Sequence, residues 1–317
     1  MFAQSVTGVR HNFNRTHIAM AEGSVLKSVT IKRGKDTPAE MCRGSAAAAD
    51  GKCYFMSLDD TNIRVYDVEK DDWFSARPSL YKNASLAVID GLLTTVGGHA
   101  PETSYKPTNA LQTLANRRWT EKFPAMTVDP ALGVDNKKYQ MAVAQSGNSL
   151  IVIGGTNNGG SQKRVDILDA ATSVWSGVHE LPGYCVRGSA TICGDELYVS
   201  EENSGEVYQC FLDELKDDSK PAGSVWTSVA NVPNDRYTTL GSLCGQPVAI
   251  GGRNSRSIYA FDPNKDCWYE IGKMALGRSR PLVAQLSQDK LVVVGGSSGK
   301  RGSANDVVIT EIITGVV

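Results

Sequence analysis

An apolar run that ends in a pair of glycines occurs four times in this chain. The clearest copy is Leu150-Ile151-Val152-Ile153-Gly154-Gly155, and the other copies end at Gly98, Gly252 and Gly296. Degenerate copies that end at Ser57 and Ser200 fill the two gaps, so that six copies follow one another roughly 40 to 60 residues apart. Self-similarity at such a period is typical of repeat architectures, and it therefore decides the fold class before any local structure is assigned.

A tryptophan follows five of the six runs at a similar distance, at Trp73, Trp119, Trp175, Trp226 and Trp268. In three copies an aspartate stands six residues before the tryptophan, at Asp67, Asp169 and Asp262. Each copy thus predicts four short strands joined by turns that are rich in Gly, Asn and Asp. A four-stranded unit cannot bury both of its faces alone, so we expect neighbouring units to stack, with each aromatic side chain burying about 150–250 Å². The paired glycines allow backbone angles, or a close approach, that a side chain would forbid.

This pattern of a hydrophobic run, Gly-Gly, an aromatic residue and Trp resembles the kelch repeat, and the resemblance covers about residues 37 to 312. It implies an all-β fold, a six-bladed kelch-type β-propeller with four-stranded blades. Ser57 and Ser200 depart from the family pattern where they replace the first glycine, and the last copy has no Trp. The fourth copy carries an insertion, residues 215–224, which we expect to be a surface loop.

The last copy ends too close to residue 317 to supply its own fourth strand. The stretch Val25-Leu26-Lys27-Ser28-Val29-Thr30-Ile31-Lys32 reads as a spare strand near the other end of the chain. We therefore predict that this N-terminal strand completes the sixth blade and closes the ring, which removes an exposed sheet edge. The predicted domains are an N-terminal extension over residues 1–24, for which disorder is one expectation, and the propeller over residues 25–317.

Composition narrows the class of protein. A formal net charge of −1 argues against nucleic-acid binding, which usually needs a basic surplus. No stretch of about 18 apolar residues is present, so we expect no membrane span. The first 20 residues have no apolar core of a signal peptide. The seven cysteines are odd in number and include no CxxC pair, and without a signal peptide we expect them to be reduced thiols in a cytoplasmic protein. We also expect the propeller to be monomeric.

In propellers of the kelch type, the loops before the first strands and after the second strands open on the same face, around one mouth of the central channel. Basic residues precede all six first strands, at Arg43, Lys82, Lys138, Arg187, Arg236, and Arg278 with Arg280. His99, Glu202 and Arg253 follow second strands. We take these ten residues as candidate binding residues, because arginine binds carboxylates with a planar, bidentate fork. The alternative is that the cations only cap exposed loops and pair with local acidic groups.

The resemblance implies that arginines at this position line the pocket in kelch domains that recruit protein partners. The sequence therefore predicts a protein-interaction module, an adaptor or substrate-recognition domain, that binds an acidic protein or peptide at an arginine-rimmed mouth. We expect no catalytic residues and no cofactor. We also expect no metal, since a lone His99 is a poor metal site. The alternative function is a sugar-acid mutarotase of kelch type, in which Glu202 and His99 would move protons. The sequence lacks the histidine sets that kelch-type copper oxidases and the iron-dependent kelch proteins of plant defence carry. It also lacks the common nucleophile, zinc and phosphate-loop motifs of enzymes.

Overall fold

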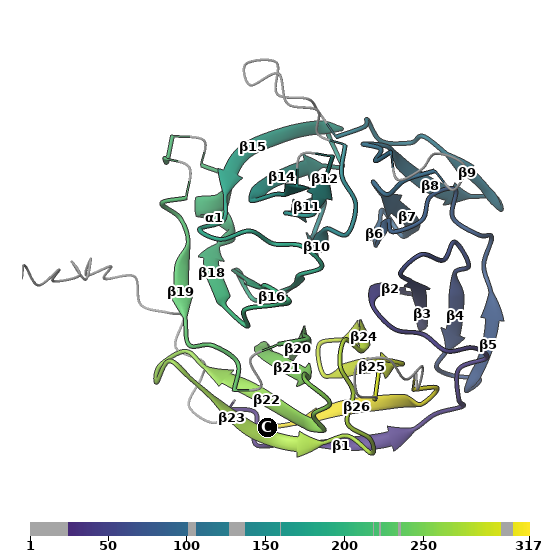
Figure 1. Cartoon of the computed structure of the whole chain (residues 1–317), viewed down its shortest axis with the longest axis vertical. Helices are drawn as coiled ribbons and strands as arrows, with labels where there is room; N and C mark the ends of the chain where they lie inside the picture. Colours follow the sequence, from purple (N-terminus) through teal and green to yellow (C-terminus); the bar gives the residue numbers. More distant parts are fainter. Residues whose placement is uncertain are drawn as a thin grey trace, which may run out of the picture.

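A computed structural model describes residues 25–100, 106–126, 137–158, 160–217, 219–221, 223–233, 236–298 and 307–317, with the side chains of residues 177 and 178 excepted. Residues 1–24, predicted to be an extension, lie outside the described residues. The described chain forms six four-stranded antiparallel sheets arranged around a central channel, a six-bladed β-propeller (Figure 1). The prediction of an all-β propeller is therefore confirmed.

The first strand of every blade lies next to the channel and the fourth lies at the circumference (Figure 1). Blade 1 consists of β2 (Gly44–Ala49), β3 (Lys52–Ser57), β4 (Arg64–Asp67) and β5 (Asp72–Ser75). Blade 2 consists of β6 (Ser85–Ile89), β7 (Leu92–Val96), β8 (Leu111–Ala115) and β9 (Arg118–Thr120). Blade 3 consists of β10 (Ala142–Ser146), β11 (Ser149–Ile153), β14 (Arg164–Asp169) and β15 (Val174–Glu180), with the small hairpin β12 (Thr156–Asn157) and β13 (Gly160–Ser161) beside it.

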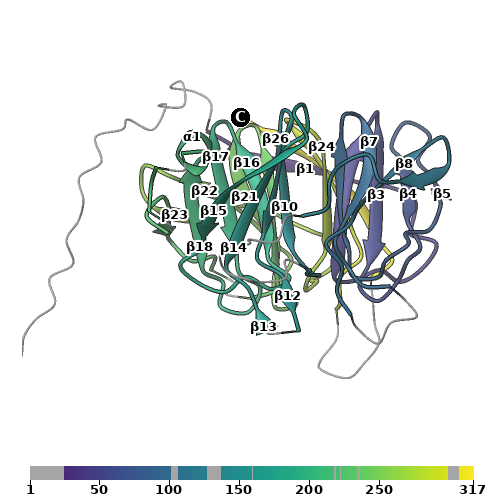
Figure 2. The same ribbon diagram turned by 90° about the horizontal axis from the view of Figure 1, so that it is seen from above.

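The remaining blades follow the same order. Blade 4 consists of β16 (Ser189–Cys193), β17 (Glu196–Ser200), β18 (Val207–Phe211) and β19 (Thr227–Val229). Blade 5 consists of β20 (Thr238–Leu243), β21 (Gln246–Gly251), β22 (Ser257–Asp262) and β23 (Cys267–Lys273). Blade 6 consists of β24 (Leu282–Ser287), β25 (Lys290–Val294), β26 (Thr310–Val316) and β1 (Ser28–Arg33). The strands cross the thickness of the disc, as the side view shows (Figure 2).

The ring closes where β1 pairs with β26, in a register that runs from Ser28 opposite Val316 to Arg33 opposite Glu311. The predicted closure of the sixth blade by the N-terminal strand is therefore confirmed. The pairing gives β26 a hydrogen-bonded neighbour on both sides, so the blade presents no edge at this point.

The hydrophobic core is divided among the joins between blades. The described buried residues form six clusters, and each cluster draws on two adjacent blades. Tyr66 and Trp73 pack with ring centroids 5.1 Å apart in the cluster between blades 6 and 1, and Phe261 and Trp268 do the same between blades 4 and 5. The repeated aromatic residues therefore hold neighbouring blades together, because an isolated blade could not bury them.

The tryptophans also bond to the preceding blade. The indole N–H of Trp73 donates to the carbonyl oxygen of Lys35 at 2.9 Å, and that of Trp268 donates to Ala230 at 2.7 Å. Trp226 differs, because it lies directly before β19 and its buried indole N–H has no hydrogen-bond partner among the described residues.

The insertion in blade 4, residues 215–224, lies just before this tryptophan. The helix α1 (Leu212–Leu215) leads into the insertion, and Leu215, the first inserted residue, is fully buried in the cluster between blades 3 and 4. The prediction of a surface loop over residues 215–224 was therefore wrong for its first residue. Nowhere in the described part of the chain is there a helix long and apolar enough to cross a membrane.

The glycine pairs join each blade to the next one. The N–H of Gly296 donates to the carbonyl oxygen of Met41 at 2.8 Å, and the N–H of Gly155 donates to that of Cys185 at 2.7 Å. A Cβ atom on Gly295 or Gly154, the first glycine of each pair, would collide with the same carbonyl oxygen. Both glycines of each pair also have a positive φ, so the pair is required by conformation and by the close approach of the next blade.

Candidate functional site

Six residues surround one end of the channel, and all six adopt the left-handed backbone conformation that is uncommon for residues other than glycine. One residue comes from each blade, one or two positions before its first strand. We call this set the mouth ring, and it consists of Arg43, Asn83, Gln140, Arg187, Tyr237 and Arg280, with φ between 49° and 64°. Recurrence of the same rare conformation in all six blades shows that it belongs to the architecture.

Backbone hydrogen bonds within the mouth ring connect adjacent blades directly. The donors and acceptors are Gln140 N to Asn83 O at 3.0 Å, Arg187 N to Gln140 O at 2.9 Å, Arg280 N to Tyr237 O at 2.8 Å, and Arg43 N to Arg280 O at 3.4 Å. These bonds fix the backbone from which the mouth side chains project.

The other two joins, between blades 1 and 2 and between blades 4 and 5, use different contacts. Each of them follows a blade whose repeat lacks the glycine pair. After Ser57 the chain turns to the mouth, where the N–H of Asp59 donates to Asn83 Oδ1 at 3.0 Å. After Ser200 it turns in the same way, and the carbonyl oxygen of Glu202 accepts the N–H of Tyr237 at 3.0 Å. The loss of the glycine pair in blade 4 is thus accompanied by the entry of an acidic side chain into the mouth.

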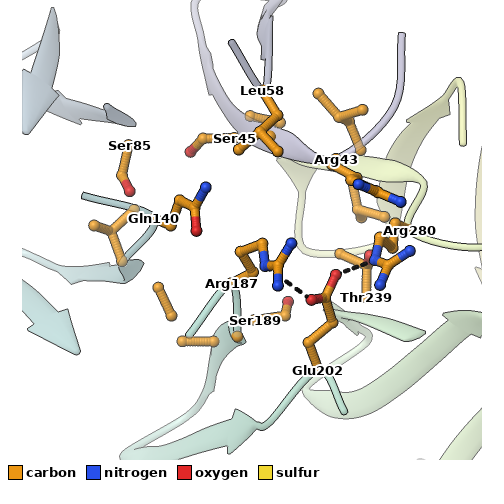
Figure 3. Close-up of a pocket in the computed structure, with 18 of the residues that line it drawn as sticks. Arg43, Ser45, Leu58, Ser85, Gln140, Arg187, Ser189, Glu202, Thr239 and Arg280 are labelled. Atoms are coloured by element: carbon orange, nitrogen blue, oxygen red, sulfur yellow. Dashed lines mark hydrogen bonds and ion pairs between the residues drawn. The ribbon is translucent and has the colours of Figure 1, made fainter. Parts of the chain in front are cut away.

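A pocket lies directly at this ring, with about 930 Å³ of space not filled by protein atoms, open solvent included. All six blades contribute lining residues, so the pocket lies on the axis of the propeller. Its ionisable lining residues are Arg43, Arg187, Arg280 and Glu202 (Figure 3).

The carboxylate of Glu202 bridges two of these arginines. Its side chain is only 4% exposed, with Oε2 at 3.1 Å from Arg187 Nε and Oε1 in contact with Arg280 Nε (Figure 3). Arg280 is held from a second side, because its guanidinium carbon lies 3.6 Å from the centroid of the Tyr237 ring. Both guanidinium groups are therefore positioned by the protein before any ligand arrives.

Two other polar side chains of the mouth ring are available to a ligand. Arg43 is exposed and Gln140 is half-buried, and both line the pocket. Neither side chain has a hydrogen-bond or ion-pair partner among the described residues. The mouth is therefore cationic over blades 1, 4 and 6 and carries neutral amides over blades 2 and 3.

Below the ring, hydroxyl groups connect blades instead of facing an empty channel. Ser45 Oγ accepts the N–H of Leu86 at 2.8 Å, and Ser85 Oγ donates to the carbonyl oxygen of Met141 at 2.7 Å. Five apolar residues, Ala46, Val143, Ala190, Leu240 and Val283, line both this pocket and a second pocket that adjoins it. The arginines and Glu202 line only the first of the two.

Two of the predicted binding residues lie in the interior of the protein. Lys138 is 2% exposed, and its Nζ lies 2.7 Å from Asp166 Oδ2. Arg278 is fully buried, where it bonds to Glu311 and to the carbonyl oxygen of Ile309 at 3.2 Å. Burial lowers the pKa of both groups, whereas the partner carboxylates favour their charged forms. These cations stabilise blades 3 and 6 internally and do not line the pocket.

Four other predicted residues lie around the mouth without lining the pocket. Lys82 and His99 exchange two backbone hydrogen bonds of 3.0 Å, and Arg236 and Arg253 are exposed, with Arg253 N donating to Arg236 O at 3.0 Å. The ring of His99 is 4% exposed, and its Nε2 lies 2.9 Å from Asn83 Nδ2. Because Asn83 also donates to Asp59, this contact supports the mouth ring from behind.

The structure thus brings together four of the ten predicted residues, Arg43, Arg187, Glu202 and Arg280. Sequence reasoning missed Asn83, Gln140 and Tyr237, which occupy the ring in place of Lys82, Lys138 and Arg236. The offset is one or two residues along the chain. Only Asn83 carried a local signal, since asparagine tolerates the left-handed conformation better than most residues. Within the described part of the chain, no group of three or more His, Cys, Asp or Glu side chains could hold a metal ion.

Comparisons with known proteins agree with this architecture. Kelch-like protein 36 of Rattus norvegicus and of Mus musculus are each 20% identical to this chain over 260 residues, which is 78% of this chain and 41% of the relative. The chain therefore matches less than half the length of these relatives. The solved structure of YjhT superimposes with a TM-score of 0.68 and 16% identity, over 87% of this chain and 95% of that one. No protein-family model matches the sequence.

The class of protein follows from the repeats, the six blades and these relatives together. The chain is a kelch-repeat β-propeller.

Proposed function

We propose that this chain is a protein-interaction module, an adaptor or substrate-recognition domain, that binds an acidic segment of a partner at the mouth of the channel. The observation that carries the proposal is the position of Arg43, Arg187 and Arg280, which come from three different blades and line one pocket. Arginine is suited to this role because its planar fork binds carboxylates with two hydrogen bonds. The similarity to two Kelch-like proteins supports a protein partner.

Arg43 offers the cleanest test, because the protein itself does not use its side chain in any described contact. Arg43→Glu reverses a charge at the pocket while the bridge of Glu202 to the other two arginines remains. We expect the affinity for a glutamate-rich peptide, measured by fluorescence anisotropy, to fall by about 1.5–3 kcal/mol, as for the loss of a charged hydrogen bond. Added salt should weaken the binding by wild type, since exposed charges are screened within about 8 Å at physiological ionic strength.

The matched control is Arg118→Glu, which makes the same change on the outermost strand of blade 2. It should leave peptide affinity and its salt dependence unchanged. Equal effects of the two variants would show that the peptide responds only to net charge, and the mouth would no longer be the proposed interface. Both variants should keep the thermal stability of wild type, which checks that the propeller is intact.

A second function is favoured by a different observation, the buried carboxylate of Glu202 among cations in the wall of the mouth pocket. The arginines would hold the carboxylate of a sugar acid, and Glu202 would move a proton in a mutarotase reaction. NMR of anomer exchange tests this directly. Exchange that is faster with wild type than in buffer, and that slows with Glu202→Gln, would support the enzyme. Exchange at the buffer rate with every sugar acid tried would eliminate it.

A further inference from the structure

Among the described residues, the lining of the mouth pocket has two more positive than negative charges. It includes the three guanidinium groups of Arg43, Arg187 and Arg280, and one acidic side chain, that of Glu202. The other described lining residues are neutral. One carboxylate cannot balance three arginines, so the pocket itself favours a ligand with more than one negative charge.

Glu202 does not take the place of the ligand. Its carboxylate is 4% exposed and contacts both arginines through their Nε atoms. Each guanidinium has five N–H donors in a fixed fork, so the Nη groups of Arg187 and Arg280 remain for an incoming anion. Since Tyr237 and Glu202 already hold Arg280 in place, binding costs little side-chain entropy there.

Arg43 completes the donor set from the side of blade 1. Its backbone N–H donates to the carbonyl oxygen of Arg280 at 3.4 Å, which ties the two residues together across the join between blades 6 and 1. The close-up shows its side chain at the same cavity as the other two arginines (Figure 3). Three guanidinium groups thus border one space.

We propose that the group accepted at this mouth is a phosphomonoester, the phosphorylated side chain of a partner segment; this rests on the proposed function in taking the mouth as the interface. A phosphomonoester carries a charge of about −1.5 to −2 at pH 7 and three acceptor oxygens, and clusters of arginines recognise it. It matches both the two positive charges and the three guanidinium groups. A carboxylate, with one charge and two oxygens, leaves one positive charge without a partner.

Three small probes separate charge from shape. Phenyl phosphate is a dianion, phenyl sulfate has the same arrangement of oxygens but one charge, and benzoate is a singly charged carboxylate. Isothermal titration calorimetry with wild type should show phenyl phosphate binding roughly tenfold or more tightly than the other two, since an added charged hydrogen bond is worth about that factor. Arg43→Gln should reduce this preference, whereas Arg118→Gln should leave it unchanged.

The pH dependence gives an independent readout. The second pKa of a phosphomonoester is about 6, so the affinity for phenyl phosphate should fall as the pH drops from 7 to 5. Benzoate and phenyl sulfate keep their single charge through that interval, and their affinities should stay level. A flat profile for phenyl phosphate would overturn the proposal, because it would show that the second charge is not recognised.

Peptides identify the source of the phosphate. A short peptide with phosphoserine should bind more tightly than the same peptide with Glu or Ser, and more tightly than inorganic phosphate. Inorganic phosphate that binds as well as the phosphopeptide would overturn the assignment to a partner side chain. If the Glu peptide binds best, the phosphomonoester is wrong and the acidic-segment function stands. If no anion binds with a dependence on Arg43, both fail.

Discussion

Glu202 of blade 4 and Arg280 of blade 6 form an ion pair that passes over the blade between them. Arg187 binds the other oxygen of the same carboxylate, at 3.1 Å. The pair therefore couples the mouth loops of three blades, because Tyr237 of blade 5 contacts both partners, through the carbonyl oxygen of Glu202 and the guanidinium of Arg280. One acidic side chain organises half of the mouth.

Removal of that charge should weaken the propeller. Glu202→Gln keeps the size of the side chain but leaves Arg187 and Arg280 facing each other without a shared carboxylate. We expect the free energy of unfolding, measured by urea denaturation, to fall by about 1–2 kcal/mol. The loss comes mainly from the charged hydrogen bond to Arg280, because the contact with Arg187 is an ion pair without hydrogen-bond geometry and Arg187 is a third exposed. Glu69→Gln, the same change at an exposed site without a described partner, should have almost no effect. Equal stability of the two variants would show that the bridge contributes nothing.

The glycine pair at the closing join should be intolerant of a methyl group. Gly295→Ala would place Cβ against the carbonyl oxygen of Met41, at a residue with φ of 64°. We expect a loss of about 3 kcal/mol or more in thermal or urea unfolding, from collision and backbone strain together. Gly91→Ala is the matched control, since Gly91 has φ of 70° but no atom within 4 Å of an added Cβ. It should cost only the left-handed strain of about 1–2 kcal/mol. Similar losses in both variants would mean that the close approach of Met41 is unimportant.

Closure of the ring predicts a sharp difference between two truncations. A chain that starts at Val25 retains β1, and we expect its melting temperature to stay nearly unchanged. A chain that starts at Gly34 lacks β1, which leaves β26 with an unpaired edge and opens the sixth blade. Its melting temperature should fall severely. Differential scanning calorimetry checks this, and identical transitions for both truncations would contradict the closure by β1.

The thiols should differ widely in reactivity. Burial raises the pKa of Cys53, Cys185 and Cys193 to about 12, whereas Cys267 is exposed. At pH 8 a thiol-specific reagent should therefore label Cys267 rapidly in the native protein and leave the other three unlabelled until it unfolds, as mass spectrometry of the digested protein would show. Rapid native labelling of Cys185 would contradict its burial under the mouth ring.

The same shifts give a direction for pH dependence. A thiol whose pKa is raised by folding contributes stability that is complete below its ordinary pKa of 9.0 and is lost as the pH rises toward about 12. The free energy of unfolding should therefore decline above pH 9. Cys53→Ser is unsuitable as a control because it removes a buried apolar contact, so the decline is best followed in wild type with and without alkylation of exposed thiols.

The sequence by itself determined the propeller. The Gly-Gly runs, the tryptophans and the Asp turns recur along the chain. Each of these features contacts residues that are near in sequence, or makes the same contact with the adjacent blade in several repeats. Asp262, for example, accepts the backbone N–H of Asn264 at 3.0 Å within a single turn, so its role can be read locally. The spare strand near residue 28 also followed from the sequence, because counting strands per repeat left one place in the ring to be filled.

The mouth was decided by the tertiary structure. Lys138 and Arg278 looked like rim residues because they precede first strands, yet Asp166 and Glu311, far along the chain, hold them in the interior. Gln140 occupies the ring instead, because hydrogen bonds to the adjacent blades select the residue that takes the left-handed conformation. Such bonds join segments more than 40 residues apart, so no local pattern encodes them. The sequence supplied the cations, and the packing of one blade against the next decided which of them reach the pocket.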